Sequence, residues 1–428
     1  MTNNEIPRPE YPRPQMVRKE WMNLNGEWDF EIDHGKTGHT RSLVEKDKLD
    51  DEILVPFCPE SKLSGVEYKD FMDAVWYKRE FEIPEDWLEQ KVLIHFGAVD
   101  YETEVWINGK SVGKHRGGYT PFTFDITEYV ETGKNQITVF AEDDVRSGLQ
   151  PGGKQSPKYN SFRCFYTRTT GICQTVWLES VPETYIDNFK VVPDPDNESI
   201  EMEVSLNGDI FDYNLTAEAF LKENSVGSSQ INVNNHTIYF NLDLSEVELW
   251  DIDNPVLYDL TLNLLDEDGN SVDKVESYFG LRTVSLTDNE ILLNGEPVFQ
   301  RLVLDQGFYP DGIYTAPSDE ALKKDIEISQ GLGFNGARLH EKIFEPRFLY
   351  WADKMGYLVW GEHANWNLDI TTAQGLEQFL PEWIEAIERD FNHPALIGWC
   401  PFNETWDNEK GTQQDDEVLR IVYETTKS

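Results

Sequence analysis

The C-terminal third of the chain decides the fold class through four short apolar runs: VFQRLV (298–303), FNGARL (334–339), YLVWGE (357–362) and ALIGWCPF (395–402). Amphipathic helical patterns separate these runs, and strands that alternate with helices are typical of a parallel sheet with right-handed crossovers. Four such repeats fill about 130 residues, whereas a closed eight-stranded α/β barrel needs roughly 250. We therefore expect residues 285–428 to form about the first half of an α/β (TIM) barrel.

Three helices are predicted between these runs, one of them through FLYWADKMG (348–356). Ser318 can cap the first, because a serine hydroxyl accepts a hydrogen bond from an early backbone N–H. Leu322, Ile326 and Leu332 are expected to share its buried face. A stripe of apolar residues within 376–391 predicts the third helix, which covers the sheet.

The preceding residues have the pattern of all-β domains. From about residue 20 to 180, short alternating apolar runs are separated by turn signals, and Asn108-Gly109 is the strongest hairpin signal among them. About seven short strands follow in roughly a hundred residues, which is the size of an immunoglobulin-like module. We expect an all-β sandwich over residues 1–182 and an immunoglobulin-like β-sandwich over 183–284.

Composition excludes several classes of partner. The chain has 428 residues, 39% of them hydrophobic, and a formal net charge of −42. This charge repels the phosphates of nucleic acids and anionic membrane surfaces, so neither is an expected partner. The N-terminus lacks the apolar core of a signal peptide and no stretch is apolar enough to span a membrane, so we expect a cytoplasmic protein.

The four cysteines predict neither a disulfide framework nor a metal site. Their spacing matches no metal-ligand motif, and four are too few to staple a chain of this length. Reduced thiols are expected, and a Cys164–Cys173 bridge is the alternative. No metal ion and no cofactor are expected.

Polar residues follow all four apolar runs, where parallel α/β folds place their chemistry. These candidates are Asp305, Arg338, His340, Glu362, Asn403 and Glu404. Four tryptophans lie near them in the sequence: Trp360, Trp366, Trp399 and Trp406. A polar cleft walled by flat aromatic rings suits a sugar, although each tryptophan could also serve packing alone.

One of these runs carries a family resemblance. NHPALIGWCPFNETW (392–406) resembles the acid/base signature of glycoside hydrolase family 2, the β-galactosidase and β-glucuronidase group. Three further segments resemble that family: NLNGEW (23–28), TGICQTVWLE (170–179) and NGEP (294–297). By this resemblance the sandwich over residues 1–182 would be a jelly-roll sugar-binding domain. The order of jelly-roll, immunoglobulin-like and barrel domains agrees with the family, so the resemblance covers essentially the whole chain.

The resemblance implies roles for the last candidates. Glu404 would be the general acid/base, and Asn403 would hydrogen-bond the 2-hydroxyl of the sugar. Burial of Glu404 against Trp399 and Trp406 is expected to keep the carboxyl protonated until it delivers its proton.

The other candidates would bind substrate. His340 lies in a segment similar to the Arg-x-Ser-His segment of the family, and Arg338 would orient carboxylates beneath the sugar. Asp305 stands near the position where many members carry a histidine. Glu362 would contact the substrate or support the residues that do, and a purely structural role is the alternative.

In this family the nucleophile is a second glutamate on a later barrel strand, and a retaining mechanism needs two carboxyls about 5 Å apart. We expect this glutamate to be missing, so that the 428-residue chain is inactive alone. The expected function is that of a retaining exo-β-glycosidase of β-galactosidase type, acting on terminal β-linked sugars of oligosaccharides or β-glycosides. β-Glucuronidase activity is one alternative, and a non-catalytic carbohydrate-binding fragment is another. Homo-oligomerisation is left open.

Overall fold

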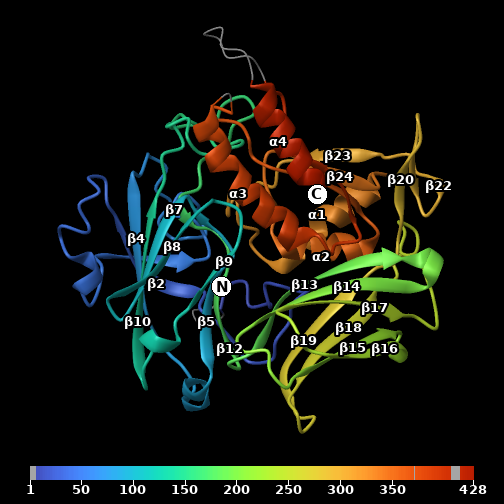
Figure 1. Cartoon of the computed structure of the whole chain (residues 1–428). Coiled ribbons are helices and arrows are strands. Elements are labelled where there is room, and N and C mark those ends of the chain that lie inside the picture. The colour runs from blue at the N-terminus through green and yellow to red at the C-terminus, as the bar shows by residue number, and fades with distance from the viewer. Residues whose placement is uncertain (1–5, 371, 406–414) are drawn as a thin grey trace.

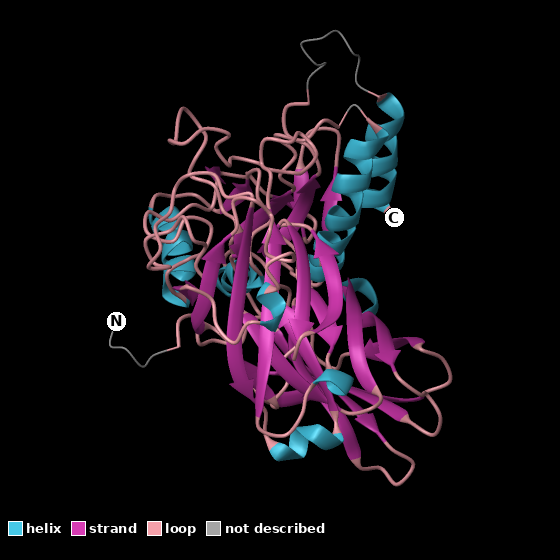
Figure 2. Ribbon diagram, turned by 90° about the vertical axis from the view of Figure 1, so that its left-hand side faces the viewer, coloured by secondary structure: helices cyan, strands magenta, loops and turns pink. Residues whose placement is uncertain are grey.

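The computed structural model describes residues 6–370, 372–405 and 415–428, and strands dominate it (Figure 1). Three groups of elements follow one another along the chain. In Figure 1 the blue and teal strands of the first group lie on the left, the green and yellow strands of the second lie at the lower right, and the orange and red elements lie above the second. Figure 2 shows the strands running through the length of the molecule, with helical segments along its upper right edge.

The first group is a sandwich of two antiparallel sheets. One sheet has the order β1 (Trp21–Asn23), β12 (Val176–Val181), β5 (Lys91–Phe96) and β9 (Phe122–Asp125). The other has the order β3 (Asp51–Val55), β2 (Gly26–Ile32), β4 (Ala74–Glu82), β10 (Lys134–Glu142), β7 (Glu102–Ile107) and β8 (Lys110–Arg116). A short pair, β6 (Val99–Asp100) with β11 (Gly171–Ile172), and the 3-10 helices η1 (Leu43–Glu45), η2 (Glu85–Glu89) and η3 (Thr127–Tyr129) complete it.

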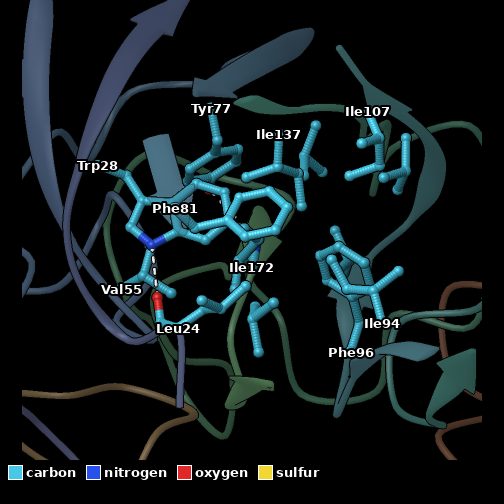
Figure 3. Packing of buried hydrophobic residues seen from close by; sticks show 14 of the residues in the cluster. Leu24, Trp28, Val55, Tyr77, Phe81, Ile94, Phe96, Ile107, Ile137 and Ile172 are labelled. Carbon is cyan, nitrogen blue, oxygen red and sulfur yellow. Dashed lines mark hydrogen bonds between the residues drawn. The ribbon is translucent and has the colours of Figure 1, made fainter. Parts of the chain in front are cut away.

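Alternating apolar residues from both sheets fill the core of this sandwich. Figure 3 shows Trp28, Tyr77 and Phe81 side by side in it, and the indole N–H of Trp28 donates to the Leu24 carbonyl at 2.8 Å. Full burial of one such large side chain contributes about 1.5–3 kcal/mol. The predicted hairpin is confirmed, because Asn108 and Gly109 have φ angles of 50° and 78° and connect β7 to β8.

Seven strands form the second sandwich. One sheet has the order β13 (Tyr185–Asp194), β14 (Ser199–Asn207) and β17 (Thr237–Asp243). The other has the order β16 (Asn224–Asn232), β15 (Asn214–Leu221), β18 (Tyr258–Leu265) and β19 (Ser271–Phe279). The 3-10 helix η4 (Pro195–Asn197) joins β13 to β14. A separate cluster of buried apolar side chains fills the space between these two sheets. The predicted strand number is thus confirmed for this part of the chain.

The third group contains a four-stranded parallel sheet. Its order is β23 (Leu302–Asp305), β24 (Gly336–Leu339), β25 (Leu358–Glu362) and β26 (Leu396–Cys400), as the apolar runs predict. The helices are α1 (Asp319–Gly331), α2 (Pro346–Met355), α3 (Ala373–Asp390) and α4 (Asp416–Lys427). A small antiparallel sheet of β20 (Val284–Leu286), β21 (Ile291–Leu293) and β22 (Glu296–Pro297) precedes them.

Two local expectations need correction and one is confirmed. The first parallel strand begins at Leu302 and not at Val298. Leu332 is 73% exposed because α1 ends at Gly331, before this residue could join the buried face of Leu322 and Ile326. The Ser318 hydroxyl does cap α1, accepting from the Ala321 N–H at 3.3 Å.

Contacts between α3 and the first sandwich hold these parts of the chain together. The carboxylate of Glu382 on α3 accepts from the Tyr119 N–H at 2.7 Å, and Glu385 accepts from the Thr120 hydroxyl at 2.6 Å. The first sandwich therefore borders the parallel sheet and can contribute residues to its edge.

The four cysteines are free thiols, so the Cys164–Cys173 bridge is absent. Burial raises the pKa of the Cys58 and Cys173 thiols well above the usual value. Within the described residues, no helix is long and apolar enough to cross a membrane.

Candidate active site

The carboxyl ends of the four parallel strands bring most of the predicted polar residues together. Arg338 pairs with Trp360 across β24 and β25, and Glu362 pairs with Cys400 across β25 and β26. Successive side chains of a strand alternate between faces, so Arg338, Trp360 and Glu362 lie on one face of the sheet. Ala337, Leu339 and Val359 lie on the opposite face, where they are buried in the cluster that includes α1 and α2 side chains.

Glu362 is the centre of a hydrogen-bonded network. Its carboxylate is fully buried and accepts from Arg338 Nε at 2.6 Å and from the Glu341 N–H at 3.0 Å. His340 Nδ1 lies 2.9 Å from Glu362 Oε1, the same oxygen that accepts from the Glu341 N–H. Burial alone would raise the pKa of Glu362, but the hydrogen bonds from His340 and Arg338 outweigh burial and lower it. The side chain is therefore a carboxylate that holds Arg338 and His340 in place.

Arg338 also fixes the orientation of Asn403. Its Nη2 donates to Asn403 Oδ1 at 2.7 Å, and the Asn403 amide nitrogen donates to none of the described residues. The Asn403 backbone is held as well, because its N–H donates to Asn365 Oδ1 at 2.7 Å and its carbonyl accepts from Trp366 Nε1 at 3.2 Å. The loop after β26 is thus anchored by the loop after β25.

Glu404 follows Asn403 at the end of this anchored segment. Its side chain is exposed and its backbone has a φ of 47°, in the left-handed region. The expected burial against tryptophans is therefore wrong: Glu404 is open to solvent at the edge of the sheet. Trp406 lies outside the described residues.

Trp399 is not beside these polar groups. It pairs with Gly361, so it lies on the helix-covered face of the sheet, and its ring packs edge-on against Trp383 of α3 at 5.3 Å between centroids. An irregularity in the β25–β26 register, between Val359 and Trp360, sets which residues of β26 face the helices. Trp399 therefore packs between the sheet and α3, which is the alternative to a role in sugar binding.

Asp305 is also separate from the network. Its carboxylate accepts from the Gly307 N–H at 2.9 Å, and burial raises its pKa. Its backbone carbonyl accepts from the His340 N–H at 2.7 Å, so the two strand ends are adjacent. Among the described residues, no side chain bridges Asp305 to Glu362.

Two polar residues of the site were not singled out from the sequence. Asn365 anchors the Asn403 N–H, and Glu341 accepts from the Trp366 N–H at 3.0 Å. Burial, with repulsion from Glu362 as a smaller contribution, raises the pKa of Glu341 to about 9, so this carboxyl is mostly protonated at neutral pH. The sequence signal that could have identified Asn365 and Glu341 is their position shortly after β25 and β24.

The first sandwich supplies a further wall of the site. Gly152 and Gly153 donate their N–H groups to the Trp366 carbonyl at 2.9 and 3.1 Å. Lys154 follows, with its ammonium 3.3 Å above the centre of the Trp366 ring. The described residues hold no cluster of three or more His, Cys, Asp or Glu that could bind a metal ion.

Comparison with known proteins gives consistent matches. Residues 21–146 match the family model described as glycosyl hydrolases family 2, sugar binding domain, and residues 184–282 match the model described as glycosyl hydrolases family 2. A putative beta-glucuronidase of Formosa agariphila is 29% identical over 351 residues, which are 79% of this chain and 41% of that protein. A beta-galactosidase of Thermoanaerobacter pseudethanolicus is 29% identical over 369 residues, which are 82% of this chain and 47% of that protein.

The alignments thus cover less than half the length of these two relatives. Among solved structures, the β-glucuronidase of Ruminococcus gnavus in complex with D-glucuronic acid aligns with a TM-score of 0.84 at 22% identity. The alignment covers 99% of this chain and 73% of that one. At this identity the likeness concerns the fold.

Proposed function

Because this chain belongs to glycoside hydrolase family 2, we propose that the ends of β24, β25 and β26 are part of the active site of a retaining exo-β-glycosidase. The observation that carries the proposal is the anchored Asn403-Glu404 pair. Asn403 is held through both its side chain and its backbone, and Glu404 follows it with an exposed carboxyl. The site thus has an oriented amide donor directly beside a carboxyl that a substrate can reach.

Glu404 acts as the general acid/base. In the first step its carboxyl donates a proton to the glycosidic oxygen while the nucleophile attacks the anomeric carbon, so the aglycone leaves as a neutral alcohol. In the second step the resulting carboxylate takes a proton from water, and the oxygen of that water displaces the enzyme from the anomeric carbon.

Asn403, Arg338 and Glu362 position the sugar. The free amide nitrogen of Asn403 donates to the 2-hydroxyl, and this contact strengthens as positive charge develops at the anomeric centre. Arg338 holds Asn403 in that orientation, and Glu362 holds Arg338. Glu362 is a positioning residue here, because its two oxygens are already occupied by protein donors.

We further propose that the nucleophile lies outside these 428 residues and that the parallel sheet is about half of a TIM barrel. The jelly-roll and immunoglobulin-like classes of the two sandwiches, the boundaries at 182/183 and 284/285, and a cytoplasmic location stay predictions.

The sugar has two candidates. A β-galactoside is the sequence-based expectation, and a β-glucuronide is the second candidate. Curated relatives carry both names, so the comparisons favour neither sugar.

The test is Glu404→Gln in a polypeptide of family length that includes these residues. The change removes proton donation and the later base while barely altering volume. A nitrophenyl aglycone leaves without protonation. With a nitrophenyl glycoside the first step should therefore survive, and a burst of released nitrophenol should appear. With an alkyl glycoside, turnover should fall by about 10²–10⁴.

Azide needs no general base, so it should restore turnover of the nitrophenyl substrate, and the product should be a β-glycosyl azide. Glu417→Gln on α4, an exposed glutamate that pairs with Arg420, is the matched control. Equal slowing of both substrates without azide rescue would rule out Glu404 as the acid/base.

A further inference from the structure

Two buried carboxyl groups flank one loop at the place where the first sandwich meets α3 (Figure 1). The loop joins β8 to β9 and contains Gly117 and Gly118. A Cβ atom on Gly118 would lie 2.5 Å from Asp100 Oδ1 of β6, and one on Gly117 would lie 2.9 Å from Glu382 Oε1 of α3. Glycine therefore lets the loop pass between an acid of the sandwich and an acid of α3.

Each of these carboxyls has one oxygen with a donor and one without. Asp100 and Glu382 are 0% and 1% exposed. Glu382 Oε1 accepts from the Tyr119 N–H at 2.7 Å, and Asp100 Oδ2 accepts from Gln155 Nε2 at 2.8 Å. Glu382 Oε2 and Asp100 Oδ1 are buried and form no hydrogen bond with any described residue. A charge in such a place is far more costly than a neutral group, so the geometry suits protonated carboxyls.

The side chains around the two carboxyls supply no positive charge. His363 Nε2 lies 3.6 Å from Glu382 Oε2, but burial lowers the pKa of His363 to about 3, so the ring is neutral at pH 7. The other groups that face Glu382 are Glu385 of its own helix, Asp100, Tyr101 and Tyr119. Those that face Asp100 are Asp143, Glu60, Gln155, Cys173, Tyr119 and Tyr314. None of these groups is a cation at neutral pH.

Both pKa values move in the direction that this environment requires. Burial, with repulsion from Glu385 as a smaller contribution, raises the pKa of Glu382 to about 8. Burial, followed by repulsion from Asp143, raises the pKa of Asp100 well above its usual value.

We propose that the first sandwich docks on α3 most tightly with Asp100 and Glu382 protonated, so that this interface tightens in acid and loosens as the pH rises. Undocking exposes Glu382 to water, where a glutamate loses its proton near the usual pKa of 4.5. Between that value and about 8, the docked state keeps a proton that the undocked state has released. Each pH unit in this window therefore shifts the equilibrium up to about tenfold toward undocking, and the effect levels off above it.

This equilibrium acts on the candidate active site. The first sandwich also supplies Gly152 and Gly153, whose N–H groups donate to the Trp366 carbonyl, and Trp366 in turn donates to the Asn403 carbonyl. Protons at the interface with α3 thus regulate how firmly this wall of the site is held, whichever sugar the site takes.

Hydrogen exchange at the Tyr119 N–H measures docking in the 428-residue chain, because this group donates to Glu382 itself. Mass spectrometry follows exchange from about pH 5 to pH 8, and each rate is divided by the intrinsic rate of an unstructured peptide at the same pH. Protection of the peptide that contains Tyr119 should fall by up to about tenfold per pH unit. Peptides of β15, which pairs with β16 and β18 of the second sandwich, should keep constant protection.

Two substitutions assign the effect to the carboxyls. Glu382→Gln mimics the protonated acid and keeps an acceptor for the Tyr119 N–H, so it should remove most of the pH dependence. Adding Asp100→Asn should remove the rest. Glu385→Gln is the matched control: Glu385 accepts from the Thr120 hydroxyl at the same interface, but 38% of its side-chain surface is exposed. This variant should keep the pH dependence of the unsubstituted chain.

Two results would overturn the inference. Constant protection of the Tyr119 peptide between about pH 5 and pH 8 in the unsubstituted chain refutes it, and this measurement needs no variant. A pH dependence that survives in the double variant, shown to be folded by its melting temperature, assigns the titration to other groups. Neither result bears on Glu404, so the proposed glycosidase activity is tested separately.

Discussion

Glu362→Gln tests the network that orders the strand ends. The substitution keeps the shape of a fully buried side chain but removes the charge that Arg338 and His340 meet at 2.6 and 2.9 Å. Breaking a buried ion pair costs about 3–5 kcal/mol, whereas an exposed pair contributes at most about 1 kcal/mol. Arg338 keeps 33% of its side-chain surface exposed, so we expect a loss between these limits, about 2 kcal/mol.

Hydrogen exchange followed by mass spectrometry measures this loss locally. The Glu341 N–H donates to Glu362 at 3.0 Å, so the peptide that contains it reports on the network. A loss of about 2 kcal/mol corresponds to roughly 30-fold faster exchange at pH 7. Glu417→Gln, which removes an exposed pair with Arg420 at 2.7 Å, should leave this peptide unchanged.

The pH dependence gives a second check on the same variant. Because the pKa of Glu362 is lowered in the folded chain, its stabilisation is present above the usual carboxyl pKa of 4.5 and is lost as the pH falls through the folded value. The difference between the two proteins should therefore shrink in acid. Unchanged exchange at pH 7, or a difference that persists at low pH, would refute the assigned role of Glu362.

Three further outcomes follow from the site. The purified 428-residue chain should show negligible hydrolysis of nitrophenyl β-glycosides, because an acid/base group supplies only about 10²–10⁴ of rate and cannot replace a nucleophile; robust turnover would mean that a carboxylate present here serves as one. Trp366→Phe should weaken binding of a methyl β-glycoside about three- to tenfold, because it removes the hydrogen bond to Asn403. Trp399→Phe should lower the melting temperature, because it weakens the contact with Trp383, and should leave the affinity unchanged. Titration and thermal melting of both variants check this. Limited proteolysis should trim the chain toward residue 285 first, because in the described part of the chain β23 and β26 each pair with one neighbouring strand, and Leu304 of β23 is 50% exposed; equal resistance of all parts would contradict this.

Local patterns predicted much of the fold. The parallel order of β23 to β26 follows from apolar runs that are separated by amphipathic helical patterns. Both signals can be recognised from neighbouring residues in the sequence. The Asn108-Gly109 hairpin follows from backbone angles that these two residues tolerate. The proximity of Arg338, His340 and Glu362 was expected for a related reason: adjacent parallel strands end at the same edge of a sheet.

The misplaced residues depended on information that is not local. The face on which Trp399 lies is set by the register of β26 against β25, which includes an irregularity that no local pattern indicates. The exposure of Leu332 depends on where α1 ends. Lys154 reaches the site only because two distant parts of the chain pack together, so its neighbours in the sequence carry no sign of Trp366.

A crystal structure of the 428-residue chain with a non-hydrolysable β-thioglycoside tests the central claim most directly. The account predicts the sugar at the ends of β24, β25 and β26, with the glycosidic sulfur within about 3.5 Å of the Glu404 carboxylate and the 2-hydroxyl within hydrogen-bond distance of the Asn403 amide nitrogen. A sugar bound on the surface of either sandwich, with the strand ends empty at saturating ligand, would contradict the account and favour a non-catalytic carbohydrate-binding protein.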